Sequence, residues 1–325
     1  MGSPQNAILT GSFVGGTTAF NISLPCEYTK FEVINVSDVG STDVNTNVMH
    51  AFATSNMPAG SAYVSNKTSS SAMVSIENMI TSNGFTFLSN TGATPNGAIV
   101  TNVSGITNAV GAVVSTITPV ANGSVVRLFS TTGALQLAGM DYTTGSYVGS
   151  TSFALANVAT APGSAASAGS FMPINTDGVY YPRTRYITGV TRATQAVIAL
   201  SVTHNYTVGQ QVRILIPAQW GMTQLNNQIV TIVAVGTQFL STGITNTITI
   251  NVDTSSYTAF AYPTSAIAAT GVSFPIVVPM GEDAASPYQN LLDDTTHNVS
   301  INGVTVGSGV QTSGSTYQWI AYAGL

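Results

Sequence analysis

The residues that come closest to a metal site lie in the stretch LLDDTTHN, where Asp293 and Asp294 are followed by His297. Paired carboxylates in a turn supply the hard oxygen ligands that calcium prefers. The same pattern is also common in solvated turns and caps, and Glu282 and Asp283 in VVPMGED have that explanation as well. Asp293 and Asp294 are therefore weak metal candidates, and we expect no resident metal or cofactor.

Other catalytic chemistry has little support in the sequence. Glycoside hydrolysis needs two carboxyl groups about 5 to 10 Å apart in a groove, and no such pair can be nominated among the twelve acidic residues. No G-x-S-x-G turn is followed by a plausible triad. The three histidines lack the spacing of metal ligands, and Cys26 is the single cysteine. We therefore expect a protein that is not an enzyme.

The main cluster of basic residues is the stretch GVYYPRTRY and the arginine shortly after it; the stretch contains Tyr180, Tyr181, Arg183 and Arg185. Tyrosine and arginine are enriched where proteins meet other proteins, so these four residues are interface candidates. The stretch also suits a segment that leads the chain into a following domain. Structural pairing of the arginines is favoured over phosphate contacts, because nucleic-acid binding draws on many clustered Lys and Arg side chains.

Arg127 and Arg213 occupy matching places in two similar segments, each on a strand with apolar neighbours. They could contact an anionic partner. Alternatively, their stems lie along the protein surface and their guanidinium groups make hydrogen bonds that hold a corner of the fold. The second interpretation is preferred, because a position that both segments share serves the fold of each segment.

Charged side chains are rare, since Asp, Glu, Lys and Arg make up 6% of the 325 residues, against about 25% in an average soluble domain. The net charge of −5 and the presence of only two lysines predict no nucleic-acid partner. Apolar runs such as SFPIVVPM are too short to span a bilayer, so we expect no membrane association. A surface of hydroxyl and amide groups is not kept apart from its neighbours by like-charge repulsion, and it suits a subunit that packs against copies of itself.

Short runs rich in Val, Ile, Thr, Tyr and Phe, bounded by Gly, Asn and Pro, indicate strands and turns. In NTITINVD, for example, Ile248, Ile250 and Val252 share one face of a strand. One short helix over 69–84 is the best exception. We predict an all-β protein of several small β-sandwich or barrel domains in tandem, with little or no helix.

One pattern occurs twice in the chain. A Gly turn precedes an Arg-bearing strand, and a Gly-Leu corner leads to a returning strand. The matching pairs are Gly123 and Gly209, Arg127 and Arg213, Gly133 and Gly221, Leu137 and Leu225, and Thr143 and Thr231. Residues 98–175 and 180–265 are therefore predicted to be two related β-modules, with the small, Pro-tipped stretch 161–173 as the linker at their boundary.

The flanking segments differ from the modules. Residues 1–97 are predicted to form an N-terminal β-sandwich. Residues 266–325 are too short to close a core alone, and their strands are expected to complete the N-terminal domain, because chain termini often lie close together.

The block YYPRTRYITGVTRATQAVIALSVTHNYTVGQQVRILIPAQWGMTQLNNQIVTI, followed by SSYTAFAYPTSA, resembles a family of uncharacterised virion proteins of tailed bacteriophages, especially those of aquatic bacteria. The segment VRLFSTTGALQLAGMDY is similar to a preceding part of the same family. The resemblance covers about residues 98–285 well and the N-terminal part loosely. It implies a place in the virion, and it carries no catalytic residues.

Composition and resemblance together predict a non-enzymatic bacteriophage structural protein, located in the virion and made in the host cytoplasm. A multi-copy, head-associated subunit (capsid decoration or cement) is preferred. A tail or adaptor component, and a tail-fibre protein that binds a host surface glycan, are the alternatives; Trp220 and Trp319 suit a core better than sugar stacking. The expected partners are copies of the chain and other virion proteins, which would cover unguarded strand edges and bury well above about 2,000 Å² per contact.

Overall fold

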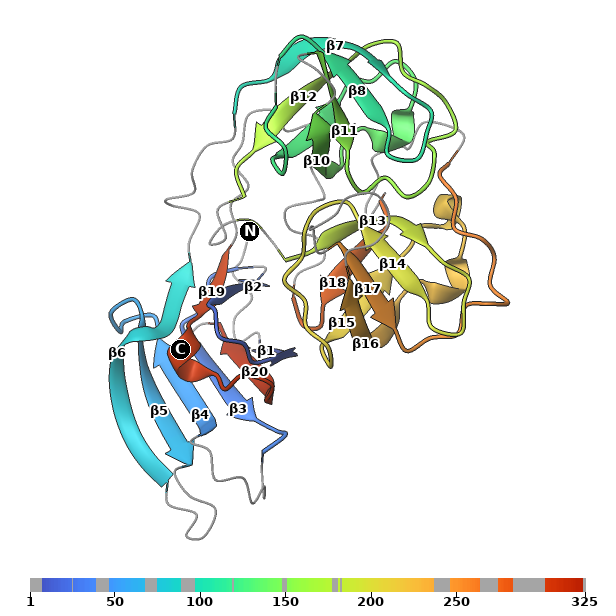
Figure 1. Ribbon diagram of the computed structural model, residues 1–325. Helices are drawn as coiled ribbons and strands as arrows, with labels where there is room; N and C mark the ends of the chain where they lie inside the picture. Colours follow the sequence, from blue (N-terminus) through green and yellow to red (C-terminus); the bar gives the residue numbers. More distant parts are fainter. Residues whose placement is uncertain are drawn as a thin grey trace.

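The computed structural model of the chain describes residues 8–24, 26–38, 47–67, 75–88, 97–118, 120–147, 151–176, 181, 183–236, 246–263, 274–282 and 302–323. Within these residues the chain forms twenty strands, four one-turn 3₁₀ helices and no α-helix. The predicted all-β fold with several small domains in tandem is therefore confirmed. Figure 1 shows a sheet built from the blue, cyan and red parts of the chain, and two barrels built from its green and its yellow to orange parts.

The sheet, called here the N-terminal sheet, has eight antiparallel strands in the order β1-β20-β3-β4-β5-β6-β19-β2. Its elements are β1 (Ile8–Val14), β2 (Phe20–Leu24), β3 (Lys30–Asn35), β4 (Asn47–Thr54), β5 (Ser61–Lys67), β6 (Ser75–Leu88), β19 (Asn302–Val306), the 3₁₀ helix η5 (Ser308–Val310) and β20 (Thr316–Tyr322). The sheet curls around one core, to which strands from both ends of the order contribute. Phe13 in β1 packs against Phe20 in β2, with ring centroids 4.9 Å apart.

Two strands of this sheet come from the far end of the chain. β19 lies between β6 and β2, and β20 lies between β1 and β3. Trp319 in β20 is buried in the core of the sheet, where it stacks on Phe31 of β3 at a centroid distance of 5.7 Å. The first and last described parts of the chain are therefore held in one domain.

Barrel 1 is a closed ring of six strands. They are β7 (Val100–Ile106), β8 (Val113–Thr116), β9 (Val125–Phe129), β10 (Asp141–Tyr147), β11 (Ser152–Leu155) and β12 (Gly169–Ile174). Around the ring their order is β7-β12-β9-β10-β11-β8. Val126 and Leu128 of β9 point into the barrel core, while Val125 and Phe129 belong to a second buried cluster on the outside of the barrel.

Barrel 2 has the same topology. Its strands are β13 (Arg185–Val190), β14 (Val197–Leu200), β15 (Gln211–Leu215), β16 (Gln228–Gly236), β17 (Thr247–Ile250) and β18 (Ile276–Pro279), and the 3₁₀ helix η3 (Ala218–Trp220) precedes β16. Around the ring their order is β13-β18-β15-β16-β17-β14. Each strand thus takes the place of the strand six positions earlier in the chain, so the sequence repeat is a repeat of a whole barrel.

The repeat also holds in the turn that follows the third strand of each barrel. Ala134 has φ 44° and Met222 has φ 43°, a left-handed conformation that is uncommon for residues other than glycine. Each of these residues leads into a one-turn 3₁₀ helix, η1 (Leu135–Leu137) in barrel 1 and η4 (Thr223–Leu225) in barrel 2. The left-handed residue at this turn is followed in each barrel by a leucine of the hydrophobic core, Leu137 or Leu225.

The glycine before each of these residues is required by close packing. A Cβ on Gly133 would lie 2.1 Å from the carbonyl oxygen of Ala165, and a Cβ on Gly221 would lie 2.3 Å from that of Ala259. Both glycines also have positive φ, 101° and 69°. Only glycine fits at these two positions, because another segment of the same barrel occupies the space of a side chain.

The helix predicted over 69–84 is wrong over 75–84, and residues 69–74 lie outside the described part of the chain. Residues from Ser75 onward form strand β6, which pairs with β5 in a register that runs from Ser75 opposite Lys67. Ile76 and Met79, which would lie on one face of a helix, are both exposed in this strand. The apolar residues have the spacing of a helix, but the segment forms a strand because its backbone makes hydrogen bonds with β5.

Two predicted boundaries are also wrong. The stretch 161–173, expected to be a linker, contains most of β12, which pairs with β7 and β9 and closes barrel 1. The second module was expected to end at residue 265, but β18 pairs with β13 and β15 and closes barrel 2. In both cases the closing strand pairs with strands distant in sequence, so nothing in its local pattern shows where it belongs.

The expectation of unguarded strand edges is wrong for the barrels, because a closed barrel has no edge strand. The N-terminal sheet has two edges, β1 and β2, and both meet the segment after β18. A Cβ on Gly11 of β1 would lie 2.2 Å from the carbonyl oxygen of Met280. The backbone N–H of Ser23 in β2 donates a hydrogen bond to the Glu282 carboxylate at 3.2 Å. At these points the chain covers its own sheet edges.

Candidate functional site

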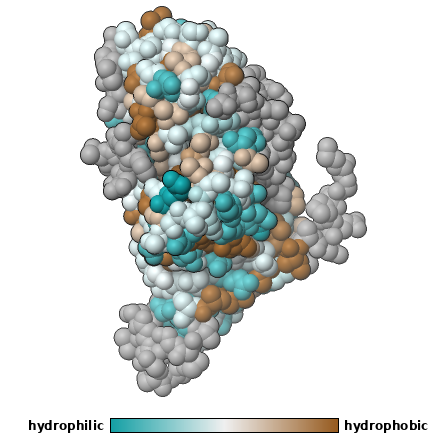
Figure 2. Space-filling model, turned by 90° about the vertical axis from the view of Figure 1, so that its right-hand side faces the viewer, coloured by the Kyte–Doolittle hydropathy of each residue, from teal (hydrophilic) through white to brown (hydrophobic). Residues whose placement is uncertain are grey.

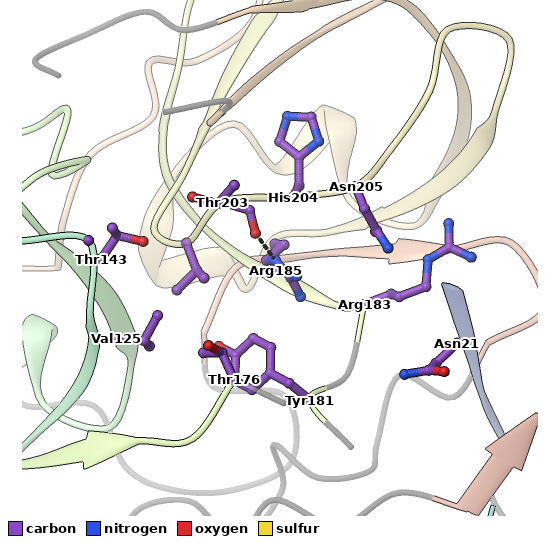
Figure 3. A pocket seen from close by; sticks show the side chains of 12 residues that line it. Asn21, Val125, Thr143, Thr176, Tyr181, Arg183, Arg185, Thr203, His204 and Asn205 are labelled. Atoms are coloured by element: carbon purple, nitrogen blue, oxygen red, sulfur yellow. Dashed lines mark hydrogen bonds between the residues drawn. The ribbon is translucent and has the colours of Figure 1, made fainter. Parts of the chain in front are cut away.

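The predicted interface residues lie where the N-terminal sheet and the two barrels meet. Tyr181, Arg183 and Arg185 are buried there, in the segment that enters barrel 2 (Figure 3). Tyr180, also an interface candidate, and the metal candidates Asp293 and Asp294 lie outside the described residues. We call the meeting point of the three domains the junction.

Arg183 joins barrel 2 to the N-terminal sheet. Its Nη1 lies 3.1 Å from a carboxylate oxygen of Glu282, which follows β18. The other carboxylate oxygen accepts the hydrogen bond from Ser23 in β2, and the guanidinium of Arg183 lies over the ring of Phe20 in the same strand, 4.6 Å from its centroid. Burial raises the pKa of the Glu282 carboxyl above its ordinary value, although Arg183 opposes this shift.

Arg185 and Tyr181 join barrel 2 to barrel 1. Arg185 donates from Nε to the carbonyl oxygen of Thr203 at 2.7 Å and from Nη1 to that of Thr184 at 2.9 Å. Its guanidinium lies 5.1 Å from the centroid of the Tyr181 ring. The hydroxyl of Tyr181 in turn donates to the Asp141 carboxylate of barrel 1 at 3.0 Å.

Asp141 is also the partner of Arg127, and the pair is buried. Arg127 donates to both carboxylate oxygens, from Nε at 2.7 Å and from Nη2 at 3.1 Å. Burial by itself would lower the pKa of the guanidinium, but Asp141 more than offsets this and the pKa lies above its ordinary value. Arg213 does not repeat the arrangement, because its cross-strand neighbour in barrel 2 is Ile229 and its side chain is half-buried.

The two barrels are in direct contact as well. The backbone N–H of Thr143 in β10 donates to the carbonyl oxygen of Ser201 at 2.9 Å. The hydroxyl of Thr188 in β13 donates to the carbonyl oxygen of Asn157. Residues of both barrels belong to one continuous hydrophobic cluster. The barrels are therefore packed together as one body, unlike domains on a flexible linker.

His204 is buried beside the junction and has a structural role. Its Nδ1 accepts a hydrogen bond from the backbone N–H of Tyr206 at 3.1 Å. The proton of the neutral ring is therefore on Nε2, which donates to the carbonyl oxygen of Thr247 at 3.2 Å. Burial lowers the pKa of His204 to about 4, so the ring is neutral at pH 7.

A cavity of about 270 Å³ lies between the three domains. Asn21 of the N-terminal sheet, Thr143 of barrel 1 and the segment from Tyr181 to Arg185 contribute to its wall. In Figure 3, Asn21 and Thr143 lie on opposite sides of the cavity, with Tyr181 and Arg185 between them. Two arginines, one histidine, threonines and asparagines line it, and no Asp or Glu is among its described lining residues.

No group of three or more His, Cys, Asp or Glu side chains gathers in the described part of the chain. Three carboxylates are buried among the described residues, and each of them is paired with a cation: Glu32, Asp141 and Glu282. No helix among the described residues has the length and apolar character needed to cross a membrane.

A second surface was not anticipated from the sequence. The outward-facing residues of β3, β4, β5 and β20 form what we call the outer aromatic face: Lys30, Glu32, Phe52, Tyr63 and Tyr322. The rings of Phe52 and Tyr63 are 5.1 Å apart, and the Lys30 ammonium lies 4.8 Å from the Tyr322 ring centroid. Alternation in KFEVIN and MHAFAT was the available signal, because Phe31 and Val33 face the core and leave Lys30 and Glu32 outside.

Hydrogen bonds hold this face in place. Glu32 pairs with Lys30 at 2.7 Å and accepts a hydrogen bond from the Tyr322 hydroxyl at 2.6 Å. Burial raises the pKa of the Glu32 carboxyl, but the hydrogen bonds from Lys30 and Tyr322 outweigh it, and the pKa lies below its ordinary value. The carboxylate is therefore ionised at neutral pH, and the aromatic rings beside it are fixed and half-exposed.

No protein-family model, curated protein or solved structure matches this chain.

Proposed function

We propose that the chain is a non-enzymatic structural subunit of a bacteriophage particle, present in many copies and associated with the head. The resemblance of residues 98–285 to virion proteins of tailed phages supports a location in the particle. The buried contacts that join the three domains support a passive, rigid role. A capsid decoration or cement subunit must keep its shape while it contacts several neighbours. Tail and adaptor components share these needs and remain the alternative placement.

The main observation behind the proposal is the location of the charged side chains. Seven of the charged residues that the structure describes are buried: Glu32, Lys67, Arg127, Asp141, Arg183, Arg185 and Glu282. Seven others are partly or fully exposed: Glu27, Lys30, Asp38, Glu77, Arg192, Arg213 and Asp253. Charged side chains are almost never fully buried unless they are paired. Half of the charged residues that the structure describes therefore lie inside the protein and do not contribute to its surface.

The surface is correspondingly poor in charge. Figure 2 shows that large areas of the viewed face are pale, the colour of residues of intermediate hydropathy, with hydrophobic side chains gathered mainly in its lower part. Ile8, Met79 and Ile117 are among the exposed hydrophobic residues of the chain. Such a surface has little like-charge repulsion to keep copies apart, which supports assembly with copies of the chain and with other virion proteins.

The location of the protein in purified phage particles tests this proposal directly. Labelled antibody and particle reconstruction should find the chain on the head, in a copy number comparable to that of the shell subunit. A few rings along the tail would instead favour the tail or adaptor role. Absence from purified particles would overturn the proposal.

Self-assembly has a separate test. Sedimentation of the purified chain over a wide concentration range should show oligomers that grow with concentration, since the proposal requires contacts between copies. A chain that stays monomeric at the highest concentration would mean that it attaches to other virion proteins alone, and the multi-copy lattice would be wrong.

Glycan binding by a tail fibre is the second candidate, and the outer aromatic face favours it. Half-exposed aromatic rings beside a carboxylate and an ammonium group can contact the apolar face and the hydroxyls of a sugar. On a glycan array, binding that Tyr63→Ala abolishes and Tyr257→Ala, a matched change on barrel 2, leaves intact would establish this role. If the chain binds no glycan on the array, the glycan-binding role is excluded.

A further inference from the structure

The cavity at the junction has walls that supply hydrogen-bond donors and positive charge. Arg183 and Arg185 are among its lining residues, together with Asn21 and Thr143. Its described lining contains no carboxylate that would repel an anion. Arginine is weakly hydrated and always charged, and it is the residue most often used for buried recognition of oxyanions.

Several of these donors have no partner in the protein. Nε of Arg183, Nδ2 of Asn21 and Oγ1 of Thr143 are buried and make no hydrogen bond. Each of the three residues is more than nine-tenths buried. A buried donor without a partner costs free energy that a bound ion or water would recover. Thr143 belongs to barrel 1 and lies on the side of the cavity opposite Asn21, whereas Asn21 and Arg183 come from the N-terminal sheet and the segment that enters barrel 2.

The orientation of Asn21 is fixed. Its Oδ1 accepts a hydrogen bond from the hydroxyl of Thr305 at 2.8 Å, so the opposite end of the amide, Nδ2, is the end without a partner. In Figure 3 this side chain points toward the space between Tyr181 and Arg183. An amide held in this way presents a donor to the junction and no acceptor, which favours an anion over a cation.

The charged and titratable groups next to the cavity do not oppose the binding of an anion. Glu282 balances the charge of Arg183 from the side of the N-terminal sheet, where it is held by Ser23. His204 is neutral at pH 7, because its pKa is lowered to about 4. The cavity reaches the solvent, since Thr203 and Asn205 in its wall are exposed. A small anion can therefore enter.

We propose that the junction cavity binds a small tetrahedral oxyanion, of the phosphate or sulfate type, between Asn21 of the N-terminal sheet and Arg183 in the segment that enters barrel 2. The volume of about 270 Å³ is sufficient for such an ion together with several waters. This site goes beyond the structural role proposed above, because it predicts that the rigidity of the subunit depends on an anion in the medium.

The test is thermal unfolding and titration calorimetry of the full chain with inorganic phosphate, sulfate, acetate and chloride at one ionic strength. Phosphate or sulfate should raise the unfolding temperature saturably, by about 2 °C or more at concentrations well above the dissociation constant. Chloride should have no saturable effect, and acetate a weaker one. An equal effect of all four salts would show that the cavity holds water alone, and the proposal would be overturned.

Variants locate the effect. Asn21→Asp keeps the size and the acceptor for Thr305 but replaces the unpartnered donor with negative charge, and it should weaken phosphate binding at least tenfold. Asn78→Asp makes the same change on the exposed part of β6 and should bind like the unaltered chain. Arg185→Gln should also lose binding, whereas Arg192→Gln, at an exposed arginine, should not. If Arg185→Gln does not fold, the isosteric Asn21→Asp decides; unchanged binding in that variant would overturn the site.

Discussion

In barrel 1 the guanidinium of Arg127 and the carboxylate of Asp141 are joined by two hydrogen bonds, at 2.7 and 3.1 Å, across strands β9 and β10. At the matching positions of barrel 2, Arg213 lies opposite Ile229. The barrels share a topology but not this ion pair. Asp141 also accepts a hydrogen bond from Tyr181 between the barrels, so the pair serves the junction rather than the fold of the repeated module.

The matched arginines give the first prediction. Arg127→Gln leaves the buried Asp141 without its counter-ion and should cost about 3–5 kcal/mol in the free energy of unfolding, measured by urea denaturation. Arg213→Gln, the same change at the half-buried matching position, should cost less than about 1 kcal/mol. Equal losses would mean that both arginines hold their own barrels, as the sequence repeat had suggested.

The pair between Arg183 and Glu282 should respond to pH in a defined direction. Arg183→Gln leaves Glu282 buried without a cation, which should cost about 3 kcal/mol or more at pH 7. Because the pKa of Glu282 is already raised above 4.5 with the arginine present, the carboxyl should become neutral on acidification, and the cost should shrink toward pH 5. Denaturant unfolding of both proteins at the two pH values measures this, and a cost that grows on acidification would contradict it.

The control for that pH effect is the double variant Arg183→Gln with Glu282→Gln, which carries no charge at this place. Its own stability should lack the pH dependence that the Glu282 carboxyl gives to the unaltered chain and to the single variant. In the unaltered chain, the raised pKa means that the folded state holds the proton of Glu282 more readily than the unfolded chain does. The contribution of this carboxyl alone therefore falls as the pH rises past 4.5.

His204 should make the protein less stable in mild acid. Its pKa is about 4 in the folded state and 6.5 in the unfolded chain, so the unfolded chain gains a proton first as the pH falls. Stability that is complete above pH 6.5 should decline toward pH 4, by roughly 3 kcal/mol in all. In His204→Asn, which keeps an acceptor for the Tyr206 N–H, this part of the decline should be absent. The same change at the half-exposed His50 serves as the control, and an unchanged slope in His204→Asn would disprove the effect.

The glycine of the repeated turn should tolerate no side chain. Gly221→Ala combines a positive φ of 69° with a Cβ that would lie 2.3 Å from the Ala259 carbonyl oxygen, so the segment must move. We expect a loss above about 3 kcal/mol in unfolding free energy. Gly123→Ala, at φ 82° with open space around the Cβ, should cost only about 1–2 kcal/mol. Similar losses at the two positions would show that backbone conformation, and not the close contact, requires glycine.

Side-chain alternation was a reliable guide to the strands. Ile248 and Ile250 are buried in β17, and Val126 and Leu128 face the core of barrel 1. Trp220, expected in a core, has no exposed surface. These predictions were possible because the two faces of a strand differ in environment, so apolar and polar residues alternate along the strand.

Pairing over long sequence distance was not accessible in the same way. The sequence predicts a linker where β12 lies, an end of the second module before β18, and a helix over part of β6, because the apolar pattern of each segment is weak on its own. What makes each of them a strand is the row of hydrogen bonds offered by neighbours such as β9 and β15. Closure of the barrels, which removes the expected strand edges, follows from the same long-range pairings.

The fold class, the repeat and the unusual stretch that contains Tyr181, Arg183 and Arg185 could be predicted from the sequence, because composition and periodicity are local properties of the chain. The contacts that those residues make depend on how the chain folds in three dimensions. Their partners Asp141 and Glu282 come from distant segments, and buried charge is stable only where a counter-charge is brought into contact with it. The cavity among the three domains is likewise not visible in the sequence, since its lining residues come from segments far apart in the chain.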